Sequence, residues 1–224
     1  LQEMGGMLMP MSSGPWTLTH TGVIAAMWVV MMVAMMLPSA TPMILLFATI
    51  ARRRRNLGQH AVDSAFFVAG YLLTWAGFSV AAVLLQFGLE QAALLSPMME
   101  ASSQWLAGAL LLAAGAYQWS PWKQSCLRRC RSPLEFLLTG WREGRWGAVR
   151  MGLAQGAWCV GCCWMLMLLL FVGGLMNLAW IAALAIFVLV EKLAPAGHWA
   201  GKAAGIGLVV WGAATLWQAA APGA

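Results

Sequence analysis

The chain of 224 residues has little charge, because Lys and Arg (13) and Asp and Glu (7) together make up only 9% of it. Soluble proteins carry roughly 25% charged residues, so this chain has too few to solvate the surface of a globule of its size. Hydrophobic residues reach 62%. This composition excludes a disordered chain and fits neither a disulfide scaffold nor a secreted enzyme. It indicates an all-α integral membrane protein.

Groups that carry catalysis are also scarce. The three histidines, His20, His60 and His198, are isolated from one another, and none stands at a recognisable spacing from a Ser or Cys nucleophile. The sequence contains no Gly-rich phosphate loop. We therefore expect a protein that is not an enzyme.

Long uncharged runs predict the membrane spans, since a helix needs about 20 mostly apolar residues to cross a bilayer. The run 151–190 has room for two spans, with turn-forming Gly173, Gly174 and Asn177 near its middle. The sequence thus predicts a bundle of six transmembrane helices, at 22–50, 65–89, 104–121, 151–172, 177–191 and 202–219.

The basic residues predict the orientation of the bundle. All 13 lie in three segments, 52–55, 123–150 and 192–202, which fall on the same side of the six predicted helices. The positive-inside rule makes that side cytoplasmic. Residues 1–21, a Met-rich segment, and the C-terminus would then lie in the periplasm of a bacterium, and 22–219 would form one domain in its inner membrane. The net charge of +6 is thereby explained by topology, without a nucleic-acid partner.

Three irregularities modify this picture. Pro38 and Pro42 lie in the second half of the first predicted helix and predict that it is broken. The cytoplasmic loop 122–150 contains apolar residues at helical spacing beside arginines, which predicts an amphipathic helix on the membrane surface; they are Leu134, Leu137, Leu138 and Trp141. The chain starts at Leu1, which suggests that a leading segment is missing.

Sulfur is abundant, with 16 Met and 5 Cys. Cys159, Cys162 and Cys163 share an arc of about 100° on one helix, because residues three and four apart lie on the same face. The other sulfur residues singled out as metal ligands form an outside cluster (Met4, Met7, Met9, Met11), two rows on the first helix (Met27, Met31, Met35; Met32, Met36) and an extension of the cysteine row (Met167). Gly152 and Gly156 predict a close approach of another helix to the cysteine helix.

Soft thiolate and thioether ligands select Cu(I), while zinc prefers Cys together with His, which is scarce here. The alternative is a purely structural role, in which Met fills irregular cores and free Cys acts as a small buried hydrophobic residue. Cys126 and Cys130 lie among arginines, which are expected to lower the pKa of their thiols. These two cysteines either form a second cytoplasmic thiol site or anchor a loop. Glu191 and Lys192 are interpreted as an ion pair at the membrane interface.

Several segments together resemble a known bacterial family, the predicted metal-binding integral membrane proteins. They are residues 27–39 with Pro42 and Met43, 117–118 with 121–123, Cys126 with 130–133, 159–164 with 176–177, and Glu191 with Lys192. Some members are regarded as copper chaperones for copper enzymes such as polyphenol oxidases. The resemblance implies copper handling and a domain of six or seven membrane helices. A seventh, leading helix would put the true N-terminus inside.

The leading hypothesis is a Cu(I)-binding chaperone or assembly factor in the inner membrane, with the lipid bilayer and a copper enzyme as its partners. One alternative is a non-catalytic accessory subunit of a larger membrane complex, with its 14 Trp residues serving protein contacts. The other alternative is a membrane thiol oxidoreductase that uses the C-x-x-C pair Cys159 and Cys162.

Overall fold

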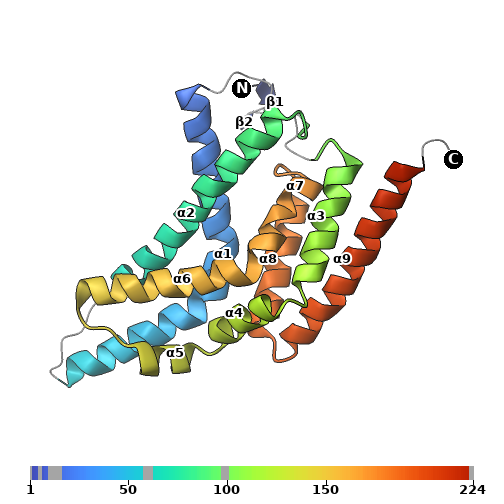
Figure 1. The fold of residues 1–224 in the computed structure, drawn as a ribbon. Coiled ribbons are helices and arrows are strands. Elements are labelled where there is room, and N and C mark those ends of the chain that lie inside the picture. Colours follow the sequence, from blue (N-terminus) through green and yellow to red (C-terminus); the bar gives the residue numbers. More distant parts are fainter. Residues whose placement is uncertain (1, 5–6, 10–16, 58–62, 97–100, 222–224) are drawn as a thin grey trace.

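The structure is a computed structural model that describes residues 2–4, 7–9, 17–57, 63–96 and 101–221 (Figure 1). This part of the chain is helical apart from one short N-terminal hairpin, as the all-α prediction requires. The elements in chain order are β1 (Gln2–Met4), β2 (Met7–Met9), α1 (Leu18–Asn56), α2 (Ser64–Gln91), α3 (Gln104–Tyr117), α4 (Pro121–Arg131), α5 (Pro133–Gly140), α6 (Gly144–Leu168), α7 (Leu170–Gly173), α8 (Leu178–Leu193) and α9 (Gly197–Ala220).

Every predicted span corresponds to a helix, but the helices differ in length. Four segments of the described chain are long and apolar enough to cross a membrane: Leu18–Asn56, Ser64–Gln91, Gly144–Gly173 and Gly197–Ala220. The helices α3 and α8 have 14 and 16 residues. At 1.5 Å per residue they are about 21 and 24 Å long, shorter than the hydrocarbon core of about 30 Å. The count of six spans therefore stays a prediction.

Helix α1 is bent rather than broken. It runs continuously through Pro38 and Pro42, and its second half turns sideways to run beneath α6 (Figure 1). A proline removes one backbone donor, which lets a helix bend without ending. Side-chain hydroxyls bond carbonyls next to the bend: Ser39 Oγ donates to the Met36 carbonyl at 2.9 Å, and Thr41 Oγ1 donates to the Leu37 carbonyl at 3.0 Å.

The region 122–150 contains more helix than the sequence predicts. Two helices, α4 and α5, occupy it, and α6 already begins at Gly144. The predicted amphipathic helix corresponds to α5, whose Leu134 is exposed while Leu137 is buried. Leu137 belongs to a small apolar cluster with Phe47 of α1 and Met151 of α6. Thus α5 packs on the protein and does not simply lie on a membrane surface.

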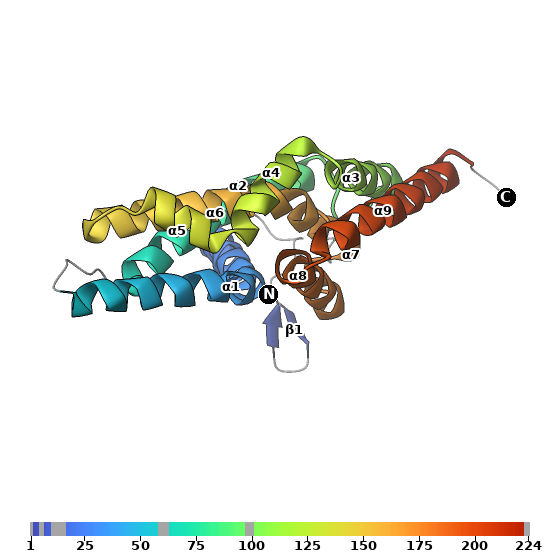
Figure 2. The same ribbon diagram turned by 90° about the horizontal axis from the view of Figure 1, so that it is seen from below.

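Glycines bring two pairs of helices into close contact. A Cβ at Gly152 of α6 would collide with the Phe67 carbonyl of α2, and one at Gly156 would lie 2.6 Å from Thr74 Oγ1. This confirms the close approach that the spacing of Gly152 and Gly156 predicts. The second pair is α3 and α9, where a Cβ at Gly115 would lie 2.9 Å from the Gly205 carbonyl oxygen. Figures 1 and 2 show α3 and α9 side by side at the end of the molecule opposite α5.

The predicted turn after α6 is present. Gly174 has φ +85°, a conformation that glycine adopts without strain. The Asn177 side chain caps α8 by accepting from the Trp180 backbone N–H at 3.1 Å. This turn sends α8 back alongside α6 and α7, so that the end of α8 returns to the level of the α6 cysteines.

Candidate metal centre

The three cysteines of α6 are buried but face different neighbours. The thiols of Cys162 and Cys163 both donate to the Cys159 carbonyl, at 3.1 and 2.9 Å. All five cysteines of the chain are free thiols. In the described ranges, no group of three His, Cys, Asp or Glu side chains is arranged to hold a metal ion. We therefore turn to the methionines that lie beside these cysteines.

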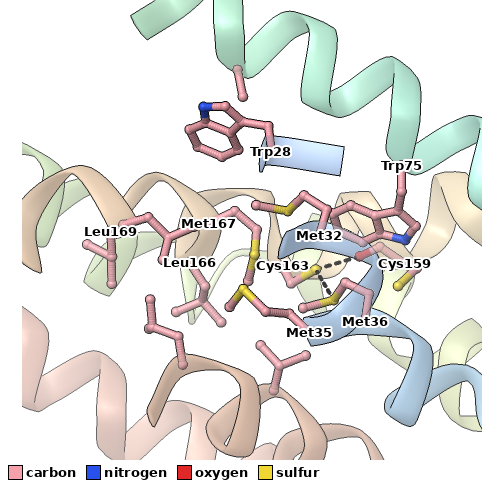
Figure 3. Close-up of a cluster of buried hydrophobic side chains, with 14 of the residues drawn as sticks. Trp28, Met32, Met35, Met36, Trp75, Cys159, Cys163, Leu166, Met167 and Leu169 are labelled. Carbon is pink, nitrogen blue, oxygen red and sulfur yellow. Dashed lines mark hydrogen bonds between the residues drawn. The ribbon is translucent and has the colours of Figure 1, made fainter. Parts of the chain in front are cut away.

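Cys163 faces a group of methionines from α1. Its Sγ lies 3.9 Å from the Met36 Sδ, and Figure 3 shows Met32, Met35 and Met167 around them. These five residues are each at most 4% exposed. We call Met32, Met35, Met36, Cys163 and Met167 the thiol–thioether cluster.

The two methionine rows of α1 are thus not equivalent. Met32 and Met36, together with Met35, lie on the buried stripe of the helix. Met27 and Met31 are half-buried and pack against the edge of the same core. Above the cluster, Trp28 donates to Gln86 Oε1 at 2.8 Å and packs 5.6 Å from the Phe171 ring. The cluster is therefore closed by aromatic side chains on the side of the N-terminal half of α1.

The N-terminal methionines belong to the hairpin. β1 and β2 are antiparallel, with Met4 opposite Met7 and Gln2 opposite Met9. Met11 lies outside the described residues. The assignment of these four methionines as metal ligands stays a prediction.

Cys159 faces a polar cavity instead of the methionines. Its Sγ lies 3.1 Å from the Tyr71 hydroxyl and accepts from Lys192 Nζ at 2.9 Å, and Lys192 also donates to Ser39 Oγ at 3.3 Å. These groups line a cavity of about 180 Å³, which we call the Cys159 cavity. Its other walls include Met43, Cys130, Arg131 and Gln155.

The thiols of α4 do not behave as the arginine-rich sequence predicts. Burial, followed by the nearby Cys162, raises the pKa of Cys126, and the opposing effect of Arg129 is smaller. A hydrogen bond with Cys162, together with burial, raises the pKa of Cys130. The prediction of lowered pKa values is wrong because burial and the neighbouring Cys162 outweigh the attraction of the guanidinium groups. Arg129 lies 4.3 Å from the centre of the Trp158 ring.

Cys126 and Cys130 contact different parts of α6, and their assignment as a second thiol site stays a prediction. Cys130 joins Cys162 and the Cys159 cavity. Cys126 lies against Gly161, where an added Cβ would come within 2.8 Å of its Sγ. Each thiol therefore connects α4 to a different face of α6.

Two charged residues that sequence reasoning assigned to the membrane interface are buried instead. Glu191 forms an ion pair with Lys123 of α4, with 2.8 Å between the charged atoms and exposures of 2% and 0%. Lys123 also donates to Gln118 Oε1. The Lys192 ammonium donates a hydrogen bond to Cys159 Sγ. The interpretation of Glu191 and Lys192 as a mutual ion pair is wrong, because adjacent residues of a helix point about 100° apart.

Sequence reasoning also missed Tyr71, Gln155 and Lys192 as members of the site. Each is a polar residue inside an apolar run or at the end of one, and intramembrane polar residues are a functional signal by default. The sequence did not show that the three residues line one cavity, since they come from α2, α6 and α8.

Comparison with known proteins agrees with this concentration of soft ligands. A family model described as PpoB2, copper chaperone, matches residues 25–215. No curated protein and no solved structure matches the chain. The matched range includes α1 from Ala25 onward, all the α6 cysteines and Lys192. The chain therefore belongs to the PpoB2 copper chaperone family.

Proposed function

We propose that the protein is a non-catalytic chaperone of the bacterial inner membrane that binds Cu(I) and hands it to a copper enzyme. The membrane location is supported by four helices long and apolar enough to span a bilayer. Large apolar side chains on α9 are exposed, including Val210 at 62% and Trp217 at 76%, as lipid-facing residues would be. With six spans, all 13 basic residues lie on the cytoplasmic side.

One observation carries the copper assignment: the 3.9 Å separation between Cys163 Sγ and Met36 Sδ. Metal–sulfur bonds of about 2.3 Å, the length of a zinc–thiolate bond, place two sulfurs about 4.0 Å apart at a trigonal angle. The two sulfur atoms thus already stand at a distance that one metal ion can bridge. Met32, Met35 and Met167 supply further thioethers in the same cluster.

The chemistry of the ligands favours Cu(I). Thiolate and thioether sulfur are soft ligands that select Cu(I) over the hard ions. Cys163 binding as a thiolate would neutralise the single charge of Cu(I), so the occupied cluster adds no net charge to the membrane interior. Thioethers add affinity without a charge and without a proton to lose.

The remaining sulfur residues would form a path along which Cu(I) reaches and leaves the thiol–thioether cluster. Met4, Met7, Met9 and Met11 would capture or release Cu(I) in the periplasm, where methionine survives oxidising conditions that pair free thiols. Met27 and Met31 would carry the ion along the edge of α1 to the thiol–thioether cluster. Cys159 and Cys162, with Cys130, continue from Cys163 towards the cytoplasmic end of α6.

Copper binding by the full chain, purified in detergent micelles, tests the proposal. Cu(I) is added under reducing conditions and its affinity is measured by competition with a chromophoric chelator. We expect Cys163→Ser and Met36→Leu to weaken binding, and Met151→Leu, a buried methionine in the separate cluster around Phe47, to leave it unchanged. Absence of bound copper in the wild type would refute the proposal, and unchanged copper binding in Cys163→Ser would show that the thiol–thioether cluster is not the site.

A further inference from the structure

Among the described residues, no carboxylate forms a salt bridge with Lys192. The buried charged side chains of the described residues are Lys123, Glu191 and Lys192. Lys123 and Glu191 neutralise each other. Lys192, 8% exposed, has no salt-bridge partner in this part of the chain, and its Nζ donates to Cys159 Sγ and Ser39 Oγ. A buried ammonium without an opposite charge is costly, so this position calls for an anion in the cavity beside it.

The Cys159 cavity contains the atoms of a second soft-metal site. Cys159, Cys130 and Met43 all line it, from α6, α4 and α1. Gln155 lines it too, is 5% exposed, and its Oε1 has no hydrogen-bond donor. A buried acceptor is rarely left unpaired, so the cavity is built for a further species. The negative end of the amide dipole favours a cation there.

The charges around the cavity determine which metal ion it would bind. We propose that the Cys159 cavity is a second Cu(I) site, formed by Cys159, Cys130 and Met43, and that Lys192 selects monovalent over divalent metal by balancing its charge. Cu(I) with two thiolates carries one negative charge, which the Lys192 ammonium cancels. A divalent ion such as Zn(II) with the same two thiolates is neutral and would leave Lys192 uncompensated. Any thiol protons leave to solvent as the metal–sulfur bonds form.

Other charges at the cavity do not disturb this balance. Arg131 also lines it, but its guanidinium donates to the Ala194 and Pro195 carbonyls at 2.6 and 2.9 Å. Arg131 is half-buried, so solvent screens its charge more than that of Lys192. The thioether of Met43 adds a ligand without adding charge.

The proposal rests on the proposed function and extends it to a pair of sites. Cys159 lies one helical turn from Cys163 on α6, so the cavity adjoins the thiol–thioether cluster. An ion released by Cys163 would reach Cys159 without leaving the protein. The two sites differ in charge, because the buried ammonium of Lys192 lines the Cys159 cavity, whereas the five residues of the thiol–thioether cluster include no charged side chain other than the thiolate of Cys163 when metal is bound.

The test measures Cu(I) and Zn(II) binding to the full chain in detergent micelles under reducing conditions. We expect the wild type to bind two Cu(I) ions, and Cys163→Ser and Cys159→Ser each to retain one. Lys192→Met should weaken Cu(I) binding at the cavity by at least about tenfold, as expected for loss of a unit charge a few Å away at a dielectric between protein and water. The same change should leave Zn(II) binding there nearly unchanged, because a neutral Zn(II) bis-thiolate replaces two neutral thiols once their protons have left.

Matched variants separate charge from folding. Lys192→Arg keeps the charge and should keep the preference for Cu(I). Lys192→Gln is a second neutral variant, in case Lys192→Met does not fold. Lys202→Met removes a lysine that lies 5.0 Å from the Trp199 ring centre, away from the cavity, and should change nothing. A rise in the ratio of Zn(II) to Cu(I) affinity is a readout that structural damage alone would not produce.

The outcomes distinguish this inference from the proposed function. If Cys163→Ser abolishes all copper binding and Cys159→Ser has no effect, the proposed function stands and the second site is wrong. Unchanged metal preference in both neutral Lys192 variants overturns the charge-balance argument. If Cys159→Ser loses copper and Cys163→Ser does not, the cavity site stands and the thiol–thioether cluster is not a site.

Discussion

The buried ion pair between Lys123 and Glu191 is expected to be a main support of the site. Its atoms lie 2.8 Å apart, and the two side chains are 0% and 2% exposed. It ties α4 to the end of α8, and through Gln118 it reaches the end of α3. Glu191→Gln would remove the carboxylate and leave Lys123 as a buried, uncompensated charge.

The burial of the Lys123–Glu191 pair sets the expected loss of stability in Glu191→Gln. Removing one partner of a buried pair costs about 3–5 kcal/mol, because the remaining charge keeps its desolvation penalty without its attraction. Replacing both partners with apolar or neutral groups of similar volume is often close to neutral. The double variant Lys123→Met with Glu191→Gln should therefore be more stable than the sum of the two single effects, by about 2 kcal/mol or more.

The free energy of unfolding in mixed micelles, measured by titration with a denaturing detergent, checks this expectation. The matched control is Glu143→Gln, which removes the ion pair with Arg54 at 3.7 Å, where the side chains are 71% and 31% exposed. An exposed pair contributes only about 0–1 kcal/mol. The reasoning is refuted if Glu191→Gln costs no more than Glu143→Gln, or if the double variant is as unstable as the two single changes added together.

Two further predictions concern helix packing and thiol reactivity. Gly152→Ala places a Cβ against the Phe67 carbonyl and should destabilise the fold by about 1–3 kcal/mol. The control is Gly77→Ala, which has nothing within 4 Å of the new Cβ and should be neutral or stabilise α2 by up to about 1 kcal/mol. Equal effects of the two changes in the same unfolding titration would contradict the close contact of α2 and α6. Because burial raises the pKa of Cys126 above its ordinary value, its alkylation by iodoacetamide should be slow at neutral pH and should keep accelerating as the solution is made alkaline, where the thiolate forms. Mass spectrometry of the Cys126 peptide measures that rate, and a plateau below pH 8 would show an activated thiol instead.

The sequence predicted the helices well because apolar runs of about 20 residues are typical of helices that can span a membrane. It predicted their ends less well. The start of α6 at Gly144 was missed because Arg145 and Arg150 interrupt the apolar run, although charged residues are good helix formers. The helix α4 was missed because its sequence is polar, and its capping pattern, Ser120 before Pro121, was the available signal.

The long apolar helices and the grouping of sulfur residues on α1 and α6 followed from the sequence by itself, because composition and helical period act locally. Only the tertiary structure decided how the cysteines are divided: Cys163 to the methionines, and Cys159 to Tyr71 and Lys192. The division depends on the bend of α1 and on the return of α8 after Gly174, which bring side chains from distant parts of the chain around one helix. Sequence spacing reports which residues share a face, but it does not report what lies opposite that face.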